Sequence, residues 1–110
     1  MKLPNGDRAV VDEGRLKDYL LSTSHPVGRF KAAFFAQLGL TTGNWEALQI
    51  QLIALASTGD AELAETTEFG RKYLIPGTLT GSGSATKDIF SVWIIREGED
   101  VPRLVTVYPR

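Results

Sequence analysis

The hydrophobic period of this chain changes at Gly59, and this change limits the fold more than any other sequence feature. Before Gly59, apolar residues recur at the three- and four-residue spacing of helices that bury one side. After it, aromatic, β-branched and threonine residues form runs separated by turn residues, which is typical of strands. Helices that precede strands in this way indicate an α+β fold, with the helices on one face of an antiparallel sheet.

Two or three helices are expected before the change of period. Asp12 is a good N-cap for the first of them, and an apolar stripe follows it. Pro26 suits the start of the second helix, and Gly39 suits its end. The third helix keeps its apolar spacing up to Gly59. The predicted helices therefore lie at about 12–22, 26–38 and 45–58.

Three or four strands are expected in the sheet. The segment 60–68 is acidic and contains little that is apolar, so it is either a solvated loop or an edge strand. A further short strand is expected near the N-terminus, at 9–11, after a turn signal at Asn5-Gly6. No repeat or second domain is visible, so residues 1–110 are expected to form one α+β domain. The long strands are predicted at 69–80, 85–95 and 103–108.

Composition excludes several classes of function. The formal net charge of -1 argues against a strong nonspecific nucleic-acid binder, although it allows a small basic site. With no cysteine and one histidine, neither a disulfide framework nor a cysteine- or histidine-based metal site is expected, and no cofactor is predicted. The chain has no apolar run of membrane-spanning length and no secretion signal. A cytoplasmic protein without membrane contact is therefore expected.

The stretch from His25 to Phe35 contains three basic side chains at the start of the second predicted helix. Free N–H groups and the helix dipole make a helix start a natural site for an anion. His25, Arg29 and Lys31 would surround it, and Lys31 lies inside an apolar arc of roughly 200°. One interpretation is therefore a phosphate-binding corner. In the alternative, His25 only caps the helix, Arg29 is solvated and Lys31 extends past the core to water.

The last two predicted strands carry polar and aromatic side chains that could join this corner. Thr106 and Tyr108 are two positions apart and therefore point to the same face of the sheet. If the second helix covers that face, both lie near the basic corner. Trp93 and Arg103 belong to the same pair of strands and are candidates for substrate contacts. For Trp93 and Tyr108, packing in the core is the alternative interpretation.

A histidine, a cationic side chain and hydroxyl groups are sufficient for cleavage of RNA without a metal. His25 would remove the 2′-hydroxyl proton or protonate the leaving oxygen. Lys31, together with Arg29, would stabilise the phosphate. Tyr108 or Thr106 would orient it.

The pattern His25-Pro26-x-Gly28-x-x-Lys31-Ala32 resembles a family of small uncharacterised bacterial domains. The opening Met1–Gly6 and the segment Pro102–Thr106 are similar to that family too. Its members occur as short free-standing proteins and as tail domains of toxin polypeptides. The order of elements is also similar to the barnase–EndoU–colicin–RelE class of ribonuclease toxins, which need no metal. The near-neutral charge departs from the basic character of many such toxins.

These observations lead to the hypothesis of a toxin-like, metal-independent ribonuclease domain. RNA would be its substrate, and a cognate antitoxin or immunity protein would be its partner. The alternative is a non-catalytic protein-binding module, in which the exposed strand or the acidic connector pairs with another protein. A toxin fold retained only for binding is a third interpretation.

Overall fold

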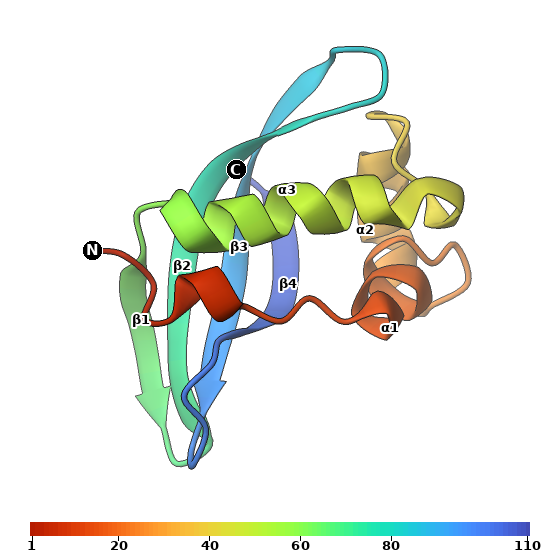
Figure 1. The fold of residues 1–110 in the computed structure, drawn as a ribbon. Helices are drawn as coiled ribbons and strands as arrows, with labels where there is room; N and C mark the ends of the chain where they lie inside the picture. The colour runs from red at the N-terminus through yellow and green to blue at the C-terminus, as the bar shows by residue number, and fades with distance from the viewer.

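The computed structural model describes residues 1–110 and confirms the α+β class, with a helical half followed by a four-stranded antiparallel sheet (Figure 1). The strands are sequential neighbours in the order β1-β2-β3-β4. Their bounds are Glu62–Thr67, Gly70–Thr80, Thr86–Arg96 and Arg103–Pro109. The helical elements are η1 (Gly6–Arg8), α1 (Glu13–Arg15), η2 (Leu16–Leu20), α2 (Gly28–Ala36), η3 (Thr42–Asn44) and α3 (Trp45–Thr58).

The third helix has the predicted bounds, whereas the first two differ. The first helix is one turn, α1, that widens into the π-type segment η2, because the Leu21 N–H donates to the Leu16 carbonyl five residues earlier. Buried Leu16 and Leu20 hold this segment in the core. The second helix begins at Gly28, two residues later than predicted, because the chain up to His25 forms a capping turn.

The strand predicted at 9–11 is wrong. Asn5 adopts a left-handed conformation with φ 52°, and the turn there leads into the short helical turn η1. Val10 forms only an isolated parallel bridge with Arg103. The acidic segment, left open as a loop or a strand, contains the edge strand β1.

Strand β2 shows how the sheet and α3 fit together. Pro76 has no backbone donor, yet it is tolerated because β1 pairs with β2 only as far as Leu74. At the next residue, Gly77, a Cβ would clash with the side chain of Leu55 on α3. The glycine therefore allows the helix to lie close against the strand (Figure 1).

Alternate residues of the central strands build the core beneath α3. On β3, the side chains of Ile89, Ser91, Trp93 and Ile95 are buried, whereas the residues between them are half-buried. The Trp93 Nε1–H donates to Ser91 Oγ at 2.9 Å, and Ser91 Oγ donates to the Ile75 carbonyl at 3.1 Å. This small network satisfies the buried polar atoms of the core. It places Trp93 where the core-packing interpretation expects it.

Replacing Ser91 with alanine should lower the free energy of unfolding by about 1–3 kcal/mol, because it leaves the Trp93 N–H buried without an acceptor. Urea denaturation followed by tryptophan fluorescence measures the change. Ser82→Ala, on an exposed turn, is the matched control and should change stability little. Equal stability of Ser91→Ala and the native protein would contradict this role for the network.

Candidate functional site

His25 caps helix α2 through its side chain. Its Nδ1 accepts hydrogen bonds from the backbone N–H groups of Val27 at 3.0 Å and Gly28 at 2.9 Å. The His25 backbone N–H donates to Ser22 Oγ at 3.1 Å. Because Nδ1 is an acceptor, the neutral imidazole carries its proton on Nε2. Nε2 is therefore the nitrogen of His25 that can meet a ligand, and it does so as a donor.

Tyr19 links this cap to the last strand. Its ring meets the His25 ring edge-on, with centroids 5.0 Å apart. Its hydroxyl shares a 3.3 Å hydrogen bond with Thr106 Oγ1 on β4. At Gly28, the first residue of α2, a Cβ would clash with the Tyr19 carbonyl. The glycine thus allows the start of α2 to approach η2, and this approach places Tyr19 between His25 and β4.

Lys31 reaches the edge of the sheet from α2. Its Nζ donates to the Val107 carbonyl on β4 at 3.0 Å. The same ammonium lies 5.9 Å from the centroid of the Tyr108 ring. Tyr108 is 36% exposed, and its ring packs against Phe90 at 5.5 Å. The lysine is therefore tied to the strand edge and does not simply extend into water.

Thr106 and Tyr108 share a face of the sheet, as predicted. They pair with Val92 and Phe90, which alternate with the buried residues of β3. Their face is thus opposite the one that α3 covers. A bulge opposite Val92 and Trp93 shifts the register of β4 so that Leu104 and Val107 both reach the core. Side chains from η2 and α2 meet this face at the outer edge of β4.

Two groups of contacts therefore meet on β4 and bring four predicted site residues, with Tyr19, to the surface between α2 and β4, named here the α2–β4 surface. Sequence reasoning missed Tyr19, which belongs to the apolar stripe expected after Asp12 in the first helix. The small residue at Gly28 was the available signal of a close approach. The members of the α2–β4 surface are Tyr19, His25, Lys31, Thr106 and Tyr108.

The other three candidates lie elsewhere. Arg29 is exposed and stacks over the Phe30 ring at 4.8 Å. Arg103 donates from Nη2 to Glu99 at 3.2 Å, at the opposite end of β4 from Tyr108. Trp93 is fully buried in the core.

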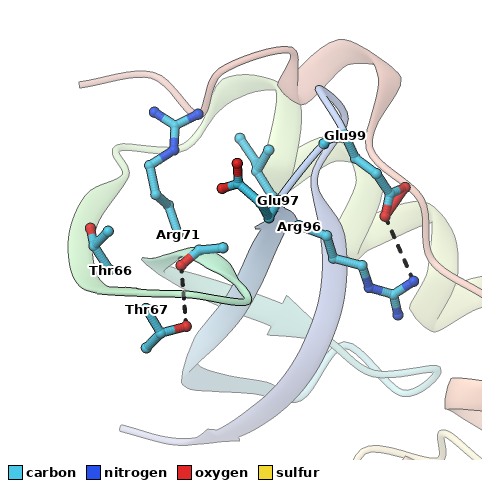
Figure 2. A pocket seen from close by; sticks show the side chains of 9 residues that line it. Thr66, Thr67, Arg71, Arg96, Glu97 and Glu99 are labelled. Carbon is cyan, nitrogen blue, oxygen red and sulfur yellow. Dashed lines mark hydrogen bonds and ion pairs between the residues drawn. The ribbon is translucent and has the colours of Figure 1, made fainter.

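A pocket of about 330 Å³ is separate from the α2–β4 surface (Figure 2). Its walls come from the β1–β2 turn and the end of β3, and they carry two arginines and two glutamates. Arg96 pairs with Glu99 at 3.8 Å inside this lining. Because the charges of the walls balance, the pocket has no evident preference for a phosphate.

No group of three histidine, aspartate or glutamate side chains lies close enough together to hold a metal ion. None of the helices combines the length and the apolar character needed to cross a membrane.

Comparison with known proteins gives a family and a structural neighbour. Residues 2–110 match the model of the family described as Domain of unknown function (DUF6883), and the chain belongs to that family. Among solved structures, it is similar to a chain of the contact-dependent growth inhibition toxin–immunity protein complex from Klebsiella pneumoniae 342. The TM-score is 0.68 at 17% identity, over 92% of this chain and 99% of that one. This likeness shows a shared fold. No curated protein matches the chain in sequence.

The capping role of His25 can be separated from any chemical role by substitution. His25→Ala should lower the free energy of unfolding by about 1 kcal/mol, because two N–H groups at the start of α2 lose their acceptor. His25→Asn should retain most of that stability, since asparagine is a good N-cap. Urea denaturation measures both.

Thr23→Ala is the matched control, because Thr23 is exposed in the same turn and makes no side-chain hydrogen bond. If His25→Ala and Thr23→Ala are equally stable, His25 does not cap α2 in solution.

Proposed function

We propose that this DUF6883 domain is a toxin-like enzyme that cleaves RNA without a metal and that it uses the α2–β4 surface. The observation that carries the proposal is that two groups of contacts meet at neighbouring residues of β4: His25 reaches Thr106 through Tyr19, and Lys31 reaches the Val107 carbonyl and the Tyr108 ring. A hydrogen-bond donor and a cation stabilise a phosphate that gains negative charge, and hydroxyl groups can orient it. The fold likeness to a chain from a toxin–immunity protein complex supports a role of the toxin or immunity type.

Lys31 is suited to hold the phosphate. Its ammonium has three protons and donates one of them to the Val107 carbonyl, so the others remain for a phosphate oxygen. The strand edge fixes its position, and a fixed cation stabilises developing negative charge without having to reorganise.

His25 is suited to donate a hydrogen bond from Nε2 to a phosphate oxygen. To remove the 2′-hydroxyl proton, Nε2 would have to be unprotonated, and the ring proton would then be on Nδ1. That Nδ1–H would point at the N–H groups of Val27 and Gly28, from which Nδ1 now accepts hydrogen bonds. The imidazolium would place an Nδ1–H against the same two N–H groups, so the cap favours a neutral His25 that stabilises the phosphate by a hydrogen bond. Water would then accept the 2′-hydroxyl proton and supply a proton to the leaving oxygen. Thr106 and Tyr108 would orient the sugar and phosphate as hydroxyl partners.

Cations over aromatic rings extend the surface at both ends. Arg15 lies 5.5 Å from the centroid of Tyr19, and Arg110 lies 5.3 Å from that of Phe90. Aromatic rings and arginines together suit single-stranded RNA, because bases stack on the rings and guanidinium groups bind the backbone. The net charge of -1 therefore does not describe this part of the molecule.

We further expect a cognate protein partner, since the similar structure is a complex of a toxin with an immunity protein. Action on RNA would place the domain in the cytoplasm.

Purified protein incubated with bacterial total RNA in EDTA should cleave it. Lys31→Met and His25→Asn should each reduce the rate by about 100-fold, because each removes a donor to the phosphate. Tyr108→Phe should cause a smaller loss. An oligonucleotide with 2′-deoxyribose at every position should not be cleaved, since the attacking hydroxyl is missing.

The control Arg71→Met removes an exposed cation from the start of β2, which pairs with Ile95 at the end of β3 away from Phe90 and Tyr108, and should cleave at the native rate. His25→Asn keeps the cap, so its loss of activity cannot be assigned to unfolding. A folded native protein that leaves RNA intact would overturn the proposal.

A further inference from the structure

The two edges of the sheet differ in how their backbone groups are covered. At β4, the Val10 N–H donates to the Pro102 carbonyl at 2.8 Å, and the Leu104 N–H donates to the Val10 carbonyl at 3.0 Å. Lys31 covers the Val107 carbonyl further along. At the other edge, β1 is exposed at five of its six residues. Figure 1 shows β1 at the edge of the sheet away from α1 and α2.

The N-terminus shows which groups of β1 face outward. The Ala61 N–H donates to the Met1 carbonyl at 2.6 Å, and the Met1 ammonium donates to the Ala61 carbonyl at 3.3 Å. Ala61 thus directs both backbone groups to the free edge. Because these groups alternate in direction along an antiparallel strand, those of Leu63 point the same way. No backbone segment of the chain pairs with this edge beyond Ala61.

The side chains along this edge are acidic with one apolar member. Glu62, Glu65 and Glu68 are exposed, and only Glu65 forms an ion pair, with Lys72 at 3.9 Å. Leu63 is 49% exposed. Two β1 strands paired together would bring glutamates close to one another, and like charges across strands are destabilising. The acidic edge would also repel a nucleic acid. A second copy and RNA are therefore poor occupants.

We propose that the free edge of β1 is a docking site for an extended strand of a partner protein that carries basic side chains. The incoming strand would continue the hydrogen-bonded ladder that Met1 begins. Its backbone would accept from the Leu63 N–H and donate to the Leu63 carbonyl, and its cationic side chains would lie against Glu62 and Glu65. Backbone pairing of this kind provides affinity, and the side chains provide specificity. The bulge between Leu63 and Glu65 adds a local irregularity that the partner strand has to match.

This site is three strand positions from β4, roughly 15 Å across the sheet. A strand bound at β1 leaves the α2–β4 surface uncovered, so the inference does not rest on RNA cleavage. It can hold for an inactive domain and can fail for an active one.

The probe is a synthetic peptide of about ten residues in which lysine alternates with valine, matched by one in which glutamate replaces lysine. Titration of the isotope-labelled protein, followed by backbone amide NMR, should shift residues of β1 with the lysine peptide. The glutamate peptide should bind at least about tenfold more weakly. Raising the salt concentration to about 300 mM should weaken binding of the lysine peptide, because salt screens exposed charge pairs.

Two kinds of variant test the contact. Leu63→Pro removes the outward N–H but no hydrogen bond to β2, and it should lower the affinity for the lysine peptide about tenfold. Leu63→Ala keeps the N–H and should lower the affinity less. The double variant Glu62→Lys/Glu65→Lys should bind the glutamate peptide more tightly than the lysine peptide. Glu46→Lys, an exposed acid on α3, is the charge control and should leave binding unchanged.

Several outcomes would overturn the proposal. One is that neither peptide binds at millimolar concentration, and another is that both peptides shift β1 equally. Dimerisation that Leu63→Pro abolishes would assign the edge to a second copy. An RNA oligonucleotide that shifts the same β1 amides would assign it to nucleic acid.

Discussion

Hydrogen bonds from the N-terminal half of the chain cover the outer edge of β4, and the arrangement of the helices follows from them. A strand at the edge of a sheet has a row of backbone groups without partners, and water or another segment must satisfy them. Here Val10 bonds to both Pro102 and Leu104, and Lys31 bonds to Val107. The two halves of the chain are thus joined at an edge as well as through the core.

The same contacts assemble the α2–β4 surface. Lys31 can present its ammonium there because the Val107 carbonyl holds it, and His25 is held by the helix end that it caps. Tyr19 completes the connection through Thr106. The polar groups with which we associate chemistry are therefore also structural. For this reason substitutions that keep the structural bond but remove the chemical group, such as asparagine at His25, are the informative ones.

Most of the fold could be predicted from periodicity. The change at Gly59 separates helices from strands, and α3 has the predicted bounds because its apolar spacing continues from Trp45 to the residue before Gly59. The first helix and the strand at 9–11 were less predictable. Packing of Leu16 and Leu20 distorts the former, and long-range pairing with Arg103 reduces the latter to a bridge. Neither effect can be predicted from local sequence signals.

The candidate site was only partly predictable. Alternation along β4 indicates that Thr106 and Tyr108 share a face. The alternation does not reveal the bulge opposite Val92. For this reason it could not show that the face of Thr106 and Tyr108 is turned away from α3. Tyr19 could not be distinguished from a core residue, because its hydroxyl partner is far along the chain. Arg29 and Arg103 match the expected residue types, but tertiary structure places them away from the surface.

Residue-resolved hydrogen exchange of the native protein tests most directly whether the chain itself closes one edge of the sheet and leaves the other open. The amides of Val10 and Leu104 should exchange at least about a hundredfold more slowly than free amides, because each donates to a backbone carbonyl at the β4 edge. The outward amide of Leu63 should exchange nearly as fast as in an unfolded chain. Exchange of Leu104 as rapid as that of Leu63 would contradict the closed edge, and with it the positions of η2 and α2 against β4.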